Sequence, residues 1–188
     1  PYTTLFRSSP PSCRATASRP KRVKMSAPKY AGGPIETWWK KGDRREWQLK
    51  CAHCPEYFVP DMVNGEISER FDALRWDPMA KREDGTWDME RVEASAGVLC
   101  PHCGRLNTEA TRLASVREGR EVATAPAAAL PRHASWRWPL WLTPWPSASW
   151  GSIASQMVEA LKNWNMQYFD NNVRAIGSKV AGQGVHVS

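Results

Sequence analysis

Two short cysteine turns decide the fold of this chain, Cys51-Ala52-His53-Cys54 and Cys100-Pro101-His102-Cys103-Gly104. Two residues between paired cysteines let both sulfurs of one turn, or knuckle, point at a single ion. A tetrahedral zinc ion takes four thiolates at about 2.3 Å. In the second knuckle Pro101 pre-sets the turn, and Gly104 lets the backbone leave it in a conformation closed to other residues. The pattern predicts a zinc ribbon in which a structural zinc is held by Cys51, Cys54, Cys100 and Cys103.

Three other interpretations of the cysteines stay open: two disulfides, a redox Cys-x-x-Cys motif, and four unliganded thiols. The N-terminal residues show no apolar run behind a basic start, so the sequence does not indicate an oxidising compartment. Redox motifs usually occur singly, near a βαβ pattern. These points favour a structural zinc site. His53 and His102 are interpreted as exposed residues within the knuckles, and Cys13 lies outside the paired set.

Composition and charge limit the class of protein. With 188 residues, 41% hydrophobic and 24% charged, the chain is typical of one or two small globular domains, and no apolar run approaches the ~20 residues of a membrane span. The net charge of +7 is unevenly spread: residues 1–50 carry 12 Lys+Arg against 3 acids, residues 51–103 carry 5 against 11, and residues 104–188 carry 9 against 5. Any contact with DNA phosphates should therefore come from the basic residues on either side of the acidic segment 51–103. A solvated or disordered basic arm explains the N-terminal run equally well.

The first half of the chain predicts short strands around the knuckles. Residues 1–24 are set aside as disordered or artefactual, because they are rich in Pro, Ser and Arg and residues 1–8 look like a translated sequencing adapter. We expect a short helix over 35–41, a strand over 46–50, a return strand over 56–60 and a strand at 98–99. Asn64-Gly65 and Asp84-Gly85 are expected to close hairpins. The segment between the knuckles has few apolar anchors, so its order should depend on the metal.

The second half predicts helices. Asn107 is expected to cap a helix over 108–118 that stops at Gly119. Residues 120–148 are interpreted as a Pro- and Trp-rich extended linker, because each proline biases its predecessor away from helix. A helical pair is predicted over 149–177. Its first apolar face comprises Trp150, Ile153, Ala154, Met157, Val158, Leu161 and Trp164, and its second Phe169, Val173 and Ile176, with a stop at Gly177. Residues 178–188 are expected to form an unstructured tail.

The fold class predicted from these elements is a small α+β chain, truncated at both ends. A zinc-ribbon-like β module with a helix occupies residues 51–119, and helices follow it. Further ordered motifs accompany the knuckles: Ser26-Ala27-Pro28, the lead-in 42–50, the block 134–145 with the helix after Ser149, and Phe169-Asp170-Asn171.

In this order the motifs resemble the large subunit of the lambda-type tailed-phage DNA-packaging terminase, over roughly residues 25–177. Ser26-Ala27-Pro28 resembles the Ser-Thr-Pro end of that family's ATPase core, and the second knuckle is similar to its Cys-Pro-x-Cys-Gly. The first knuckle departs from the family at Ala52 and Pro55. Gly119-Arg120-Glu121 replaces the family's Gly-x-Trp.

The resemblance implies a motor protein. Members of the family translocate double-stranded DNA with ATP and cut it with a metal-dependent nuclease. Residues 25–50 would then be the end of the ATPase domain and a lead-in strand, with Ser26, Ala27 and Pro28 in the segment that couples ATP hydrolysis to DNA movement. The implied partners are double-stranded DNA, the terminase small subunit and the capsid portal. The implied full-length protein is a homo-oligomer in the bacterial host cytoplasm, a phage or prophage product away from membranes.

The predicted role of the chain itself is structural. It shows no Gly-x-x-x-x-Gly-Lys-Ser/Thr phosphate loop and no acidic cluster in the context of a two-metal nuclease. We therefore predict no catalytic residue, and we assign ATP and Mg²⁺ only to the full-length parent. The leading hypothesis is a zinc-binding connector between the ATPase and the nuclease. The alternative is a stand-alone zinc-ribbon module that binds nucleic acid or protein. A catalytic zinc is disfavoured, because four thiolates leave no open coordination position.

Overall fold

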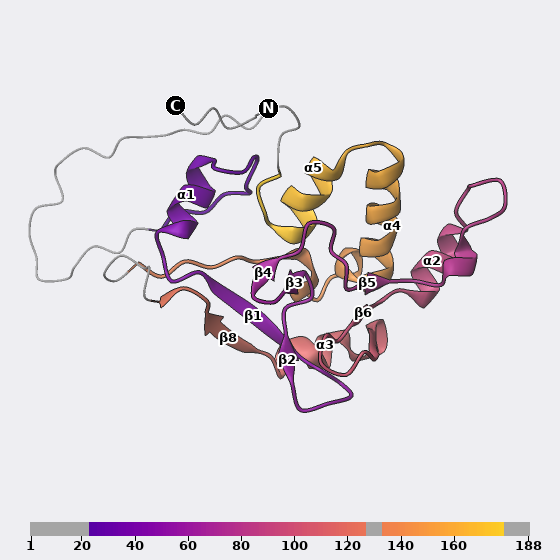
Figure 1. Cartoon of the computed structure of the whole chain (residues 1–188), viewed down its shortest axis with the longest axis horizontal. Coiled ribbons are helices and arrows are strands. Elements are labelled where there is room, and N and C mark those ends of the chain that lie inside the picture. Colours follow the sequence, from indigo (N-terminus) through magenta and orange to yellow (C-terminus); the bar gives the residue numbers. More distant parts are fainter. Residues whose placement is uncertain (1–22, 127–132, 179–188) are drawn as a thin grey trace, which may run out of the picture.

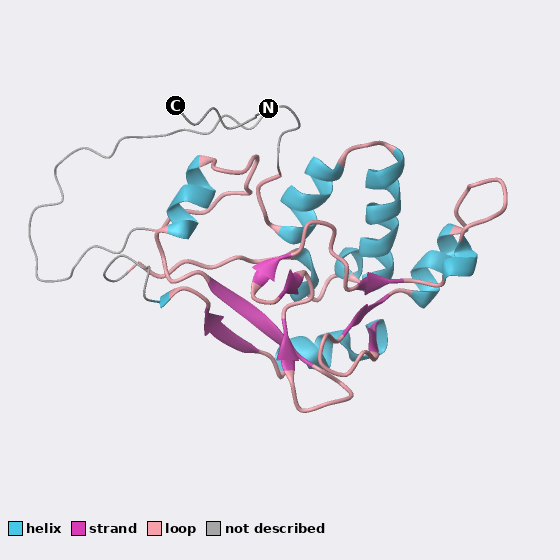
Figure 2. Cartoon of the chain, in the orientation of Figure 1, coloured by secondary structure: helices cyan, strands magenta, loops and turns pink. Residues whose placement is uncertain are grey.

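Short strands run through the middle of the molecule, with most of the helices above them in the view and α3 (Glu109–Arg117) below them (Figure 1). The computed structural model describes residues 23–126 and 133–178. Figure 2 shows that helices and strands are mixed along this part of the chain, which confirms the predicted α+β class. Residues 1–22, for which disorder was expected, and residues 179–188 of the expected tail lie outside the described residues. Ser178, the first residue of the expected tail, pairs with Tyr30, and its carbonyl accepts from the Ala31 amide at 2.9 Å.

The strands form three small antiparallel sheets, β2-β1-β8, β3-β4 and β5-β6-β7. The first comprises β1 (Arg45–Lys50), β2 (Tyr57–Phe58) and β8 (Arg120–Ala123). The second is a hairpin of β3 (Met62–Val63) and β4 (Glu66–Ile67), closed by Asn64-Gly65 as predicted. The third comprises β5 (Leu74–Arg75), β6 (Gly97–Leu99) and β7 (Leu106–Thr108). The other predicted turn, Asp84-Gly85, lies between the bridged residues Lys81 and Trp87.

The knuckles sit at the ends of two of these strand pairs. The first knuckle joins β1 to β2, with Leu49 opposite Phe58 and Lys50 opposite Tyr57. The second joins β6 to β7, with Leu99 opposite Leu106. The strands predicted on either side of the first knuckle and before the second are therefore confirmed. α1 (Pro34–Lys40) confirms the short helix that precedes β1.

The interpretation of residues 120–148 as an extended linker is wrong in two places. Residues Arg120–Ala123 form β8, which pairs with β1 in the register Arg45↔Ala123 to Gln48↔Arg120. This strand is half-exposed and charged, so it lacks an apolar alternation, and its hydrogen bonds to β1 determine its structure. Further on, the 3-10 helices Leu140–Leu142 and Pro146–Ala148 interrupt the extended run. Residues 127–132 of the predicted linker lie outside the described residues.

The predicted helix after Ser149 is confirmed as α4 (Trp150–Lys162), and the Ser149 hydroxyl accepts from the Ser152 amide at 3.1 Å. Its buried face runs from Trp150 to Ala160, whereas Leu161 and Trp164 are 51% and 95% exposed, which corrects that end of the predicted face. α4 packs against α2 (Met89–Ser95), which the sequence did not predict. A Cβ on Gly151 would lie 2.7 Å from the Glu93 carbonyl oxygen, so the close approach of these helices requires glycine.

The second helix of the predicted pair is less regular than expected. α5 (Met166–Phe169) continues into a π-helix over Asp170–Arg174, and the helix ends at Ala175 with a φ of 53° instead of at Gly177. Phe169 and Val173 are buried, as predicted. Their side chains join a core in which the Phe71 ring lies 5.0 Å from Trp141 and 6.4 Å from Phe169, and Trp141 lies 6.3 Å from Trp150. Trp141 of the Trp-rich segment and Trp150 of α4 therefore lie at the centre of the core.

A buried ion-pair network joins the central sheet to the C-terminal helices. Arg137 donates from Nε to both carboxylate oxygens of Glu46 at 2.9 Å, and from Nη1 and Nη2 to Asp61 at 2.6 and 2.9 Å. Arg174 lies 3.5 Å from Asp61 and pairs with Asp170 at 2.9 Å. Burial would lower the pKa of Arg137, but the Asp61 and Glu46 carboxylates outweigh it and raise that pKa. Glu46 comes from β1, Arg137 from the segment before the 3-10 helix Leu140–Leu142, and Arg174 from the π-helix, so the network fixes these elements together.

None of the helices within residues 23–126 and 133–178 is both long enough and apolar enough to span a bilayer.

Arg137→Ala should lower the free energy of unfolding by about 3–5 kcal/mol, because it leaves Glu46 and Asp61 buried without their partner. Arg91→Ala is the matched control: Arg91 also pairs with an aspartate, Asp77, at 2.7 Å, but its side chain is 49% exposed, so the loss should stay below about 1 kcal/mol. Urea denaturation of the metal-saturated chain measures both values. Equal losses in the two variants would contradict the structural role of the network.

Candidate metal centre

The structure brings together the four cysteines of the two knuckles. The Sγ atoms of Cys51 and Cys103 lie 3.8 Å apart, as do those of Cys54 and Cys100, and all four lie within 4.8 Å of one another. A tetrahedron of sulfurs with 2.3 Å bonds to a central ion has edges of about 3.8 Å. Cys51 and Cys100 are buried, Cys54 is half-buried and Cys103 is exposed. The four cysteines are therefore positioned to hold one metal ion.

The disulfide interpretation does not fit this geometry. Each of the four cysteines is a free thiol. Sulfurs 3.8 Å apart are far beyond the ~2.05 Å of a disulfide bond.

The two knuckles are closed by the same backbone hydrogen bond but leave the turn differently, because Pro55 cannot adopt the positive φ of Gly104. The Cys51 amide donates to the Glu56 carbonyl and the Cys100 amide to the Arg105 carbonyl, both at 3.0 Å. Gly104 has a φ of +67°, as its predicted role requires. Pro55 occupies the equivalent place in the first knuckle. The first knuckle departs from the family pattern, but its turn is still closed by the hydrogen bond from the Cys51 amide to the Glu56 carbonyl.

The electrostatics of the four-cysteine cluster favour a bound cation. Burial opposes ionisation of Cys51, but hydrogen bonds from the His53 amide and from neighbouring cysteines outweigh it and lower the pKa of Cys51 to about 6. Burial raises the pKa of Cys100 to about 12. The pKa values of these two thiols thus move in opposite directions, and four thiolates at this spacing would repel one another. A thiophilic divalent cation removes this conflict, because it binds the deprotonated sulfurs.

Asn107 supports the metal centre and does not cap a helix, which corrects the prediction made for it. It lies in β7 and is 2% exposed. Its Oδ1 accepts from the Ala52 amide of the first knuckle at 2.9 Å, and its Nδ2 donates to the Val98 carbonyl at 3.4 Å. The cap of α3 (Glu109–Arg117) is Thr108, without a side-chain hydrogen bond. Asn107 therefore links the first knuckle to the strand pair that bears the second.

The knuckle histidines are exposed, as predicted, but each reaches across to the strands of the other knuckle. His53 Nε2 donates to the Leu106 carbonyl at 3.0 Å, and His102 Nε2 donates to the Tyr57 carbonyl at 3.3 Å. Each histidine directly precedes the second cysteine of its knuckle. This repeated position is the sequence signal for a reciprocal bond that the sequence analysis missed.

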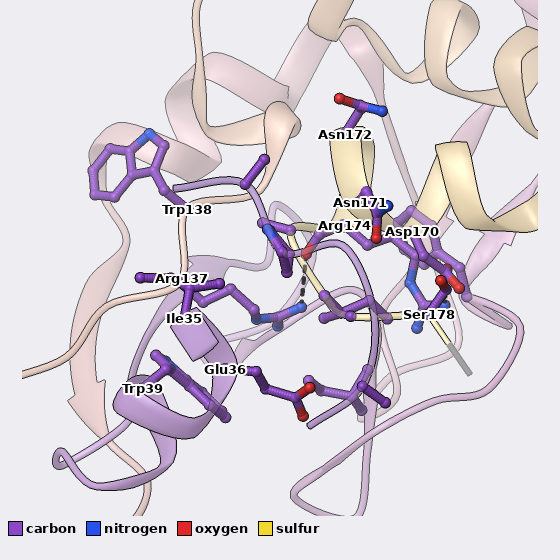
Figure 3. Close-up of a pocket in the computed structure, with 18 of the residues that line it drawn as sticks. Ile35, Glu36, Trp39, Arg137, Trp138, Asp170, Asn171, Asn172, Arg174 and Ser178 are labelled. Carbon is purple, nitrogen blue, oxygen red and sulfur yellow. Dashed lines mark hydrogen bonds and ion pairs between the residues drawn. The ribbon is translucent and has the colours of Figure 1, made fainter. Parts of the chain in front are cut away.

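The other predicted site residues lie elsewhere. Ser26, Ala27 and Pro28 line a cleft of about 2240 Å³ beside α1 and the π-helix (Figure 3), and the cysteines are not among its lining residues. Ser26 and Ala27 are exposed and Pro28 is half-buried. Their assignment to an ATPase coupling segment stays a prediction.

Fold and site together define a small α+β protein with four cysteines positioned to hold a metal ion. The model of the family described as phage terminase large subunit gpA, ATPase domain, matches residues 12–120, which is more than half of the chain and includes all four cysteines. The chain therefore belongs to this family of phage DNA-packaging ATPases. The matched span begins within the range 1–24 that was set aside from the fold prediction. No curated protein and no solved structure matches the chain.

Asn107→Ala should weaken zinc binding by about 10- to 100-fold, because it removes the side chain that holds the first knuckle to β6 and β7. Asn172→Ala is the control, since Asn172 is exposed and its side chain bonds only within its own helix, to the Tyr168 carbonyl. Competition with a chromophoric chelator measures the affinity. An unchanged affinity in Asn107→Ala would contradict the support assigned to this residue.

The double variant His53→Ala, His102→Ala should transfer its zinc to a chelator several-fold faster than the unaltered chain. Each substitution removes one hydrogen bond between the two knuckles, and such a bond contributes about 0.5–1.5 kcal/mol. His133→Ala, which leaves both knuckles unchanged, should transfer zinc at the original rate. Stopped-flow absorbance follows the transfer. Rates that match in all three proteins would show that the histidines are only exposed fillers.

Proposed function

We propose that this chain is the zinc-stabilised connector segment of a phage terminase large subunit, with a structural part in the ATP-driven packaging of double-stranded DNA. The observation that carries the proposal is the four-sulfur cluster inside the span matched by the terminase ATPase family. Zinc is the proposed metal because four cysteines in Cys-x-x-Cys pairs are its usual structural ligand set.

The proposed zinc has a structural role. Four thiolates fill its coordination shell, so no position remains for water or substrate. Structural zinc sites bind with an apparent ~10–16 kcal/mol, which is large beside the stability of a small core. Bound between the two knuckles, the ion would tie the β1-β2 pair to the β6-β7 pair.

The connections of β1 support a connector role. One end of β1 enters the first knuckle, and the other follows α1 and the proposed coupling segment Ser26–Pro28. In the middle of the strand, Glu46 joins the ion-pair network of Arg137, Asp61 and Arg174. β1 therefore connects the proposed coupling segment, through the chain, with the metal centre and, through the ion-pair network, with the C-terminal helices.

The remaining parts of the proposal follow from the family. The proposed partners are double-stranded DNA, the terminase small subunit and the capsid portal, with a homo-oligomeric large subunit in the host cytoplasm, from a phage or prophage. ATP, Mg²⁺ and the endonuclease activity are assigned to other parts of that protein.

A stand-alone zinc-ribbon module is the second candidate function. The observation that favours it is the exposure of Trp136 and Trp138, 53% and 60%, beside basic residues. Such a module would bind DNA on its own with a strong salt dependence, whereas the connector would need the rest of the motor for duplex binding.

The metal assignment predicts one zinc per chain by elemental analysis, with cooperative unfolding lost on chelation. Cys103→Ser should lose the metal and most of the stability, while Cys13→Ser should keep both, because Cys13 lies outside the set. A Cys103→Ser chain that keeps a full zinc and its stability would contradict the four-thiolate site.

The packaging role is tested by transplanting residues 25–177 into a functional terminase large subunit in place of its own corresponding segment. The chimera should package DNA in an ATP-dependent reaction, and the same chimera with Cys103→Ser should not. Packaging that is independent of Cys103, or ATP hydrolysis by the chain alone at a motor's rate, would contradict the connector role.

A further inference from the structure

Four exposed tryptophans line the large cleft: Trp164, which follows α4 and is 95% exposed, and three others. Trp38 of α1, Trp136 and Trp138 all line the cleft of about 2240 Å³, and they are 39%, 53% and 60% exposed. Figure 3 shows Trp138 and Arg137 leaving the same segment in different directions, with Arg137 directed to the carbonyl of Arg174 at 3.1 Å. Exposed indoles in this number are unusual for a protein surface and indicate a ligand that has flat apolar faces.

The segment that carries two of these rings is rigid. Residues 135–139 alternate between buried and exposed positions, with Ser135 and Arg137 inward and Trp136 and Trp138 outward. Ser135 is fixed by the Asp43 carboxylate at 3.0 Å and by the Trp39 carbonyl at 2.8 Å, and Arg137 is fixed by the buried ion-pair network. Residues two apart on an extended chain are about 6.6 Å apart. This is about twice the ~3.4 Å rise per base along a DNA strand, so one planar base fits between two such residues.

Unpaired cations lie beside Trp38 and its neighbour Trp39, and the guanidinium of Arg45, which pairs with Asp43 and Glu121, lies 5.4 Å from the Trp136 ring centre. Residues 23–45 carry six Lys and Arg against two acids, a net charge of +4. The Lys24 and Lys41 Nζ atoms lie 3.3 and 5.1 Å from the Trp38 ring centre, and the Arg44 guanidinium lies 5.9 Å from that of Trp39. Within the described ranges, no carboxylate forms an ion pair with Lys24, Lys41 or Arg44. These three charges are therefore not neutralised and can attract a phosphate backbone, although Arg44 Nε and Nη2 already donate to the Lys40 carbonyl at 3.3 and 3.1 Å.

Rings for stacking beside unpaired cations are the combination that holds single-stranded nucleic acid. Duplex DNA hides the faces of its bases and would meet only the cations. We propose that Trp38, Trp136 and Trp138, with Lys24, Lys41 and Arg44, form a tryptophan face that binds single-stranded nucleic acid. This inference goes beyond the connector role, because it concerns a different surface from the metal centre. It deepens the second candidate function, on which it rests, by assigning the exposed tryptophans an unpaired strand instead of a duplex.

The test titrates the zinc-loaded full chain into a fluorescein-labelled 12-nucleotide oligo-dT and into a labelled 12-base-pair duplex, with anisotropy as the readout. The single strand should bind more tightly than the duplex. Trp38→Ala and Trp138→Ala should each weaken single-strand binding by about 5- to 100-fold and leave duplex binding nearly unchanged, since stacking contributes ~1–3 kcal/mol per base. Lys41→Gln should reduce the salt dependence by about one counterion.

Trp145→Ala is the matched control. Trp145 is 63% exposed, like Trp138, but does not line the cleft, so this variant should bind as the unaltered chain does. Residues 1–22 contribute five further Lys and Arg and no acid, and these alone would produce salt-dependent binding. Salt dependence therefore does not identify the tryptophan face, whereas the tryptophan variants do. Absent binding, equal affinity for duplex and single strand, or equal losses in Trp138→Ala and Trp145→Ala would overturn the proposal. Zinc content and thermal unfolding of each variant show separately whether the metal centre is intact, so failure of this proposal is distinguishable from failure of the connector.

Discussion

The structure depends on the meeting of four sulfurs from two turns that lie far apart in the sequence. The knuckles at Cys51–Cys54 and Cys100–Cys103 end two separate strand pairs, and their sulfurs converge within 4.8 Å. Four ionised thiols at this spacing repel one another, whereas a bound cation makes the same arrangement favourable. The reciprocal histidine bonds and the Asn107 bridge add specific contacts between the two halves. The metal is thus proposed to set the relative position of strands that share only short hydrogen-bonded contacts.

A second, metal-independent anchor lies on the other side of β1. Arg137 joins Glu46 of this strand to Asp61, and Arg174 extends the pairing to the π-helix. The same extended segment places Ser135 and Arg137 inward and Trp136 and Trp138 outward. One short stretch of chain therefore both ties the helices to the central sheet and presents rings to solvent. A surface held this rigidly would lose little conformational entropy on binding a ligand.

Much of the fold was predictable because its signals are local. The knuckle spacing, the Asn64-Gly65 hairpin and the apolar face of α4 each depend on residues close together in sequence, and the structure confirms all three. β8 was not predictable, because its pairing with β1 joins residues about 75 positions apart and its own sequence is charged. α2 lies in a polar segment whose order comes from its contact with Gly151 and its neighbours on α4.

In the candidate site, too, features with a local sequence signal were predictable, and features that depend on distant residues were not. The cysteine spacing predicts the four-sulfur cluster directly. Asn107 has the same local sequence signal whether it caps a helix or bridges two strand pairs, and only tertiary structure separates these roles. The acceptors of the knuckle histidines, the Leu106 and Tyr57 carbonyls, are 53 and 45 residues away from their donors. The repeated position of the histidines indicates that they have a shared role, but only the tertiary structure identifies these distant acceptors.

The most direct test of the account is X-ray absorption at the zinc K edge on the purified, zinc-loaded chain. The account predicts a first shell of four sulfur scatterers at about 2.3 Å, with no nitrogen or oxygen neighbour. A shell that contains nitrogen or oxygen, or fewer than four sulfurs, would contradict the four-thiolate centre from which the connector role is argued.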